Sequence, residues 1–193
     1  MADWQIFVQM GIQHITDFGA YDHMLFLATI CALYRPQDWQ RLLLLVTAFT
    51  IGHSVTLIMG SIWGSFLSVS LTEWLVGLSI LLGGIYNLIR PLEWHRKNRW
   101  PSYALALGFG LIHGLAFSGF FQGMGFISGE LIVPLLSFNL GVEAGQLLIV
   151  GGLMLVAYLI TEVGKIDFRY WMLGLSFLAI AGGALMVIQR WPW

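Results

Sequence analysis

Long apolar runs constrain the fold of this chain more than any other feature. A helix needs about 20 apolar residues to cross the roughly 30 Å hydrocarbon core of a bilayer. We expect spanning helices over residues 18–34, 38–60, 71–90, 102–122, 131–159 and 169–190. The chain is 58 % hydrophobic and only 10 % charged, with a mean hydropathy of +0.80. The sequence therefore predicts an all-α, multi-pass membrane protein with six transmembrane helices, in one transmembrane domain over residues 1–193.

Charge and cysteine content exclude several classes of function. The net charge of -1 and the pI near 6.5 argue against nucleic acid as a partner, because its binders carry dense Lys and Arg patches. The single cysteine, Cys31, excludes an internal disulfide and a thiolate metal cluster. The expected partners are the lipid bilayer and a metal ion, and the sequence leaves a homo-oligomer open.

The basic residues predict an orientation. All but one of the nine lie in the first, third and fifth connectors: Arg35, Arg41, Arg90, Arg96, Lys97, Arg99, Lys165 and Arg169. Only Arg190 lies elsewhere. Because short loops rich in Lys and Arg stay cytoplasmic, we expect a bacterial inner (plasma) membrane protein with both termini on the periplasmic or extracellular side.

An amphipathic pattern precedes the first apolar run. Its apolar positions recur at helical spacing: Trp4, Phe7, Val8, Ile12 and Ile15. The opposite face is polar: Gln5, Gln9, Gln13 and Thr16. We therefore expect a short N-terminal amphipathic helix at the outer-facing interface of the same membrane, or alternatively a frayed apolar tail.

Ionisable side chains recur at one depth of the predicted bundle. The candidate metal ligands are His14, Asp22, His23, His53, His113 and Glu143. From Asp22 onward, helical rise places them roughly 6 to 18 Å below the outer edge of the membrane. Charged groups inside a bilayer are costly and are usually functional. Imidazole and carboxylate without thiolate form a ligand set for zinc, nickel, cobalt, manganese or iron. Each residue alone could equally be a buried helix–helix hydrogen bond.

Polar neighbours on the same helix faces complete the candidate site. We expect supporting hydrogen bonds from Thr50, Ser54, Asn139 and Gln146. Gly110 and Gly114 flank His113 at a spacing that lets helices approach closely. His14 and His23 are nine residues apart and would face opposite ways on one straight helix. Both can join one site only if the chain bends, and TDFGA at 16–20 supplies a capping aspartate and a glycine for that bend.

Four blocks of this sequence resemble a known family. They are HITDFGAYDHMLF at 14–26, VTAFTIGHSVTL at 46–57, GFGLIHGLAFSG at 108–119 and FNLGVEAGQL at 138–147. Together they resemble the HupE/UreJ membrane proteins, which are regarded as nickel or cobalt permeases. In the better-known members, five residues separate the first histidine from the Asp-His pair, whereas seven separate His14 from Asp22 here. The chain is therefore similar to a variant branch, and the resemblance implies a metal more firmly than it implies transport.

The sequence supports three functions. The first is a permease for nickel, cobalt or zinc, in which the candidate ligands hold the ion during passage. The second is an intramembrane zinc hydrolase acting on a lipid-like substrate, with Glu143 or Asp22 as general base and Ser54 or Asn139 orienting the substrate. The third is a metal sensor or accessory subunit.

Overall fold

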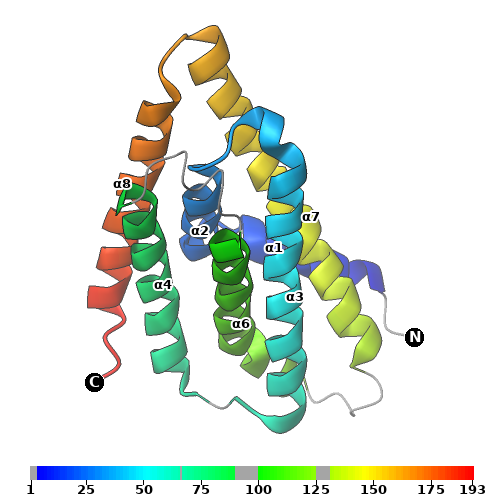
Figure 1. Ribbon diagram of the computed structural model, residues 1–193. Helices are drawn as coiled ribbons and strands as arrows, with labels where there is room; N and C mark the ends of the chain where they lie inside the picture. The colour runs from blue at the N-terminus through cyan, green and yellow to red at the C-terminus, as the bar shows by residue number, and fades with distance from the viewer. Residues whose placement is uncertain (1–3, 66, 90–99, 125–130) are drawn as a thin grey trace.

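The computed structural model describes residues 4–65, 67–89, 100–124 and 131–193, and these residues form helices and connections without strands (Figure 1). The helices are α1 (Trp4–Thr16), α2 (Tyr21–Cys31), α3 (Trp39–Trp63), α4 (Val69–Ile89), α6 (Trp100–Gly123), α7 (Ile132–Tyr158) and α8 (Phe168–Gln189). A short 3₁₀ turn, Pro36–Asp38, precedes α3, and a π-helical turn, Leu159–Val163, ends α7.

Five helices of the described residues are long and apolar enough to span a membrane, namely α3, α4, α6, α7 and α8. The sixth expected span, 18–34, contains α2, which has 11 residues and is therefore only about 16 Å long. The expected count of six is thus not confirmed. Helix α2 begins only at Tyr21 because residues 17–20 form a turn. Pro36 follows its C-terminal end, where proline disfavours continuation of the helix.

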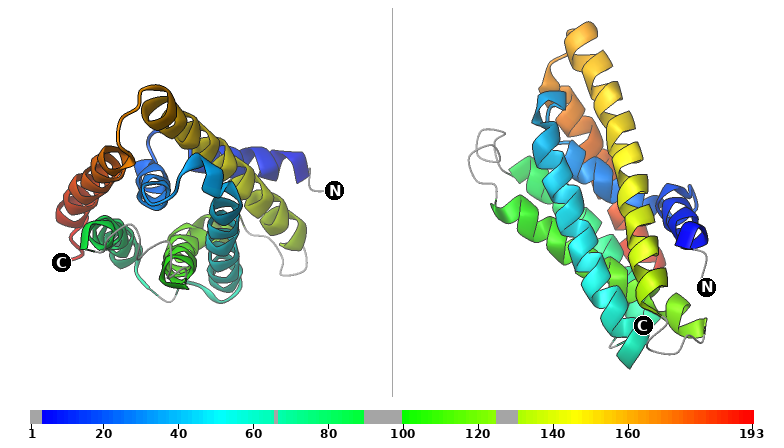
Figure 2. Two further views of the ribbon diagram at one scale, coloured as in Figure 1. Left: turned by 45° about the horizontal axis from the view of Figure 1, so that its top comes forward. Right: turned by 90° about the vertical axis from the view of Figure 1, so that its right-hand side faces the viewer.

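The N-terminal helix α1 lies across the long helices rather than along them (Figures 1 and 2). Its buried residues are Phe7, Gly11 and Ile15, spaced four apart on one face. A Cβ added to Gly11 would collide with the carbonyl oxygen of Phe138 on α7. The glutamines of the opposite face are exposed. The predicted apolar face therefore packs against α7, where glycine permits backbone contact.

Glycines also bring α3 and α6 together. A Cβ at Gly110 would meet the carbonyl oxygen of Phe49, and one at Gly114 would meet the carbonyl oxygen of His53. Residue numbers rise together along this contact, so α3 and α6 run parallel. Gly114 follows His113 in the chain, so this close approach places His53 and His113 at the same level along the axis of the bundle.

The two ends of the bundle differ in their number of basic residues. The α2–α3 and α7–α8 connections lie at one end, while the α3–α4 connection and the C-terminus lie toward the other (Figure 1). Arg35, Arg41, Lys165 and Arg169 belong to the first end, and Arg190 follows the last residue of α8. The expected third basic connector, with Arg90, Arg96, Lys97, Arg99 and His95, lies outside the described residues.

Candidate metal centre

The break between α1 and α2 brings two histidines together. The chain leaves α1 after Thr16, and the Asp17 carboxylate accepts a hydrogen bond of 2.8 Å from the backbone N–H of Gly19. The ring centroids of His14 and His23 are consequently 4.7 Å apart. The predicted bend at TDFGA is confirmed, and it turns two positions nine residues apart toward each other. The expected cap is wrong, because Ala20 is the N-cap residue of α2 and Asp17 bonds only within the turn.

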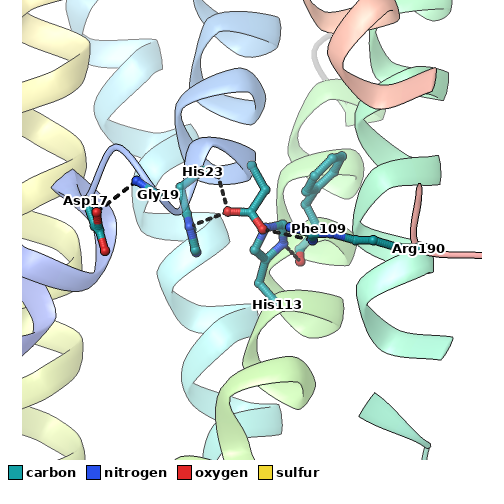
Figure 3. A network of polar contacts seen from close by, with 7 residues as sticks. Asp17, Gly19, His23, Phe109, His113 and Arg190 are labelled. Atoms are coloured by element: carbon teal, nitrogen blue, oxygen red, sulfur yellow. Dashed lines mark hydrogen bonds and ion pairs between the residues drawn. The ribbon is translucent and has the colours of Figure 1, made fainter. Parts of the chain in front are cut away.

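Asp22, His23 and His113 form the tightest group of metal-binding side chains in the described part of the chain. One ligand atom from each lies within 4.8 Å of the others. The two histidines are buried, and the Asp22 side chain is 14 % exposed. Figure 3 shows His23 of α2 and His113 of α6 side by side in the centre of the bundle. Two helices far apart in sequence thus supply one group.

His53, on α3, lies outside this three-residue group but near His14. Its ring is fully buried, with its centroid 6.5 Å from that of His14. Its Nδ1 lies 3.0 Å from Oδ1 of Asn139 on α7. The Asn139 amide nitrogen donates to the Leu135 carbonyl, so Oδ1 is the atom that must accept from His53. The His53 proton therefore resides on Nδ1.

The other two buried histidines each have an oxygen atom near Nδ1. His113 Nδ1 lies 3.1 Å from the Phe109 carbonyl oxygen, which can only accept a hydrogen bond. His23 Nδ1 lies 2.9 Å from Oδ1 of Asp22, at ion-pair distance but without hydrogen-bond geometry. In the neutral ring of His113 the proton is thus on Nδ1 and the lone pair on Nε2. Partners of this kind orient metal-binding histidines in many proteins.

Three lone pairs are left without hydrogen bonds. The Nε2 atoms of His23, His53 and His113 are buried and have no hydrogen-bond partner among the described residues, and the same holds for Nδ1 of His23. Unsatisfied buried polar atoms cost free energy, and natural proteins keep few of them. Neutral imidazoles with free Nε2 atoms are the ligands of zinc, nickel and cobalt. Nitrogens on one tetrahedral zinc lie roughly 3.4 Å apart, given Zn–N bonds of about 2.1 Å. Asp22, His23 and His113 therefore offer ligand atoms for a transition-metal ion, whereas His53 lies outside this three-residue group.

An open cavity of about 360 Å³ leads to this group. His14, Asp22, His23 and His113 line it. Asp17, Glu73 and Arg190 also line it, from the α1–α2 turn, the first turns of α4 and the end of α8. Glu73 and Arg190 lie near the ends of their helices that are remote from the α2–α3 and α7–α8 connections. The cavity therefore opens toward the end of the bundle with fewer basic residues.

Phenylalanines close the opposite side of the group. Phe49 and Phe109 each precede a histidine by one helical turn, and Phe26 follows His23 on a helix that runs the other way. The ring of Phe26 lies 4.0 Å from that of Phe109 and 5.0 Å from that of Phe49, between centroids. All three rings are buried. This aromatic layer separates the histidines from the α2–α3 end of the bundle.

Glu143 lies apart from the three-residue group. Its carboxylate accepts a hydrogen bond of 2.8 Å from the Thr47 hydroxyl, and the side chain belongs to a half-buried residue between α7 and α3. Next to this pair, Thr50 donates to the Gln146 amide oxygen at 3.1 Å. With His53 and Asn139, these pairs form a polar seam of three contacts along α3 and α7. The predicted supporting residues Asn139, Thr50 and Gln146 lie in this seam.

The remaining predicted supporting residue, Ser54, makes a local contact. Its hydroxyl donates to the Thr50 carbonyl, one turn back on its own helix, at 2.7 Å. Serine often satisfies itself in this way on a helix. No described contact of Ser54 reaches the histidine group.

Several residues of the site were not predicted. Arg190 contacts Asp22, with Nη1 3.4 Å from Oδ2. The Phe109 carbonyl orients His113, and Asp17 and Glu73 line the cavity. The sequence held one signal for Arg190, because it is the only basic residue outside the three basic connectors. The role of the Phe109 carbonyl could not be predicted, because every residue type has a backbone carbonyl.

Comparison with known proteins assigns the chain to a family. A search of curated proteins and one of solved structures gave no match. The family model described as HupE / UreJ protein matches residues 1–191. The match covers nearly all of the chain, including every residue of the histidine group. The four blocks of sequence similarity, the spanning helices and the buried histidines agree with this assignment, and the chain belongs to the HupE/UreJ family.

Proposed function

We propose that this protein is a permease for a divalent transition-metal ion, with nickel, cobalt or zinc as the cargo. The ion binds Nε2 of His23, His53 and His113, with His14 beside them as a further ligand. Asp22 holds the proton on Nδ1 of His23. The observation that carries this proposal is the set of three buried Nε2 atoms without hydrogen bonds, on three different helices.

The cavity suits cation entry. Asp17 and Glu73 add negative charge to its wall, and like-signed charge in a cleft raises the local concentration of the opposite ion. Short basic loops favour the cytoplasm, so the cavity faces the periplasm in the proposed orientation, with both termini on that side. In this arrangement the histidines lie within the outer half of the bilayer.

Release inward requires movement of the aromatic layer. In the described state the buried rings of Phe26, Phe49 and Phe109 lie between the histidines and the proposed cytoplasmic end. The polar seam of α3 and α7 runs past this layer and carries Glu143 one turn beyond Asn139. We assign Glu143 to this inward route, as a ligand that receives the ion after the histidines.

Uptake into proteoliposomes tests transport directly. Wild type should accumulate nickel, cobalt or zinc, and His113→Ala should not. Glu143→Gln should bind metal like wild type while its uptake falls, because only the inward route is changed. His95→Ala, in a connector predicted to lie outside the spans, is the matched histidine control. Absence of uptake by wild type for all three metals would refute a permease.

The closed aromatic layer favours a second candidate, an intramembrane zinc hydrolase. Three histidines leave a coordination position for water, and the 360 Å³ cavity is larger than an ion requires. Glu143 is bonded to Thr47 and lies outside the three-residue group, so Asp22 is the better candidate for a general base. Zinc that survives purification and resists exchange would favour this enzyme, whereas readily exchanged metal would favour transport. A metal sensor would instead retain a stable protein partner on affinity purification.

A further inference from the structure

The cavity contains a positive charge that a cation site does not need. Arg190 is the C-cap residue of α8 and its side chain is 25 % exposed. It lines the cavity together with Asp22, His23 and His113. Its Nη1 is 3.4 Å from Oδ2 of Asp22, and Figure 3 shows its side chain extending toward His113 from α8. A guanidinium beside a divalent cation raises the energy of the bound ion.

Arg190 and Asp22 are joined by a single long contact rather than by a two-bond ion pair. Arginine and carboxylate commonly pair through two parallel hydrogen bonds of about 2.7–2.9 Å. Here one long contact is present. The other carboxylate oxygen accepts a hydrogen bond of 2.9 Å from the His23 backbone N–H, and the His23 Nδ1 atom lies 2.9 Å from the same oxygen without hydrogen-bond geometry. Arg190 therefore neutralises Asp22 without fixing its position, because His23 already does so.

Other partners for Arg190 are close. Its guanidinium carbon lies 5.9 Å from the ring centroid of Tyr21, within the range of a cation–π contact. Glu73 lines the same cavity and is exposed. The backbone is helical before Arg190 and without regular structure in the three residues after it. The side chain can thus leave Asp22 without breaking a helix.

We propose that Arg190 is a tethered cation, which pairs with Asp22 in the absence of metal and moves toward Tyr21 and Glu73 when the ion binds. The inference rests on the proposed metal site at His23, His53 and His113. Arg190 compensates the charge of Asp22 inside the empty protein and weakens the hold on the ion once it has bound. Its function is to keep affinity low enough for release.

Metal titration of purified protein tests this role. Arg190→Gln should bind zinc or nickel at least tenfold more tightly than wild type, whereas Arg190→Lys, which keeps the charge, should stay within threefold. Arg169→Gln removes one positive charge from the opposite end of the same helix and should bind like wild type. If Arg190 instead only supported Asp22, Arg190→Gln would bind more weakly, since loss of such support lowers metal affinity by about 10–100-fold.

A second readout follows the movement itself. Trp191, the next residue, packs edge-on against Trp74 with ring centroids 5.8 Å apart. Zinc should change tryptophan fluorescence in wild type, and most of that change should disappear in Trp191→Phe and in Arg190→Gln. Unchanged or weaker metal affinity in Arg190→Gln would overturn the proposal for Arg190. Absence of metal binding in every variant, wild type included, would refute the metal site and the proposal with it.

Discussion

Replacing Asn139 with leucine tests whether the protein fixes the proton position of its histidines. Asn139 makes no contact with the proposed ion. Its Oδ1 accepts the Nδ1 proton of His53 at 3.0 Å, and its amide nitrogen is anchored on the Leu135 carbonyl at 2.8 Å. Leucine has a similar volume but no acceptor. His53 would then lose the partner that keeps its lone pair on Nε2.

The expected cost follows from this contact. Loss of a hydrogen bond that orients a metal-binding histidine typically lowers metal affinity about 10–100-fold. This corresponds to about 1.4–2.7 kcal/mol of binding free energy. His53 is one of three proposed ligands, so binding should weaken but persist. Asn139→Asp keeps an acceptor and should retain affinity within about threefold of wild type.

Isothermal titration of the detergent-solubilised protein with zinc or nickel measures this change. Gln146→Leu is the matched control, because Gln146 is buried on the same helix and contacts Thr50 rather than a histidine. It should leave affinity unchanged. If Asn139→Leu binds as tightly as wild type while His53→Ala binds poorly, the proposed proton position on His53 is wrong.

Three further perturbations give expected outcomes. Gly110→Val should lower the thermal unfolding temperature sharply or prevent folding, because its side chain would overlap the Phe49 carbonyl. Gly108→Val should be tolerated, because no described atom lies within 4 Å of an added Cβ there. Similar unfolding temperatures for the two variants would contradict the α3–α6 packing. Zinc at about 100 times its dissociation constant should stabilise the fold by about 2.7 kcal/mol and a chelator should reverse this, with no such shift in His113→Ala; an equal shift there would place the ion elsewhere. Cys31 is fully buried and should react with a maleimide only after denaturation, as followed by mass spectrometry; rapid labelling of folded protein would contradict its position.

Much of the helical framework could be predicted from composition. Five of the expected spans agree with α3, α4, α6, α7 and α8 to within three residues. Such agreement is expected because backbone groups in a bilayer must form hydrogen bonds within their own segment, so a long apolar run forms a helix there. The 18–34 run is not confirmed as a span, because turns at its ends limit its helix, α2, to 11 residues.

The candidate ligands were only partly predictable. His23, His53 and His113 were identified because ionisable groups are rare and costly in apolar helices. Asn139 and Glu143 lie four residues apart on one face of α7, so sequence spacing gives them equal access to a site on α3. The axial register of the two helices decides that Asn139 meets His53 while Glu143 meets Thr47.

The sequence by itself determined that this chain forms membrane helices and that histidines gather at one level, because hydropathy and helical rise are properties of each segment alone. The tertiary structure decided that Nε2 of His53 and His113 is free, that Asp22 faces both His23 and Arg190, and that phenylalanine rings close one side. These features depend on contacts between segments up to 168 residues apart. Such contacts are fixed by glycine-mediated packing and helix register, which no single segment encodes.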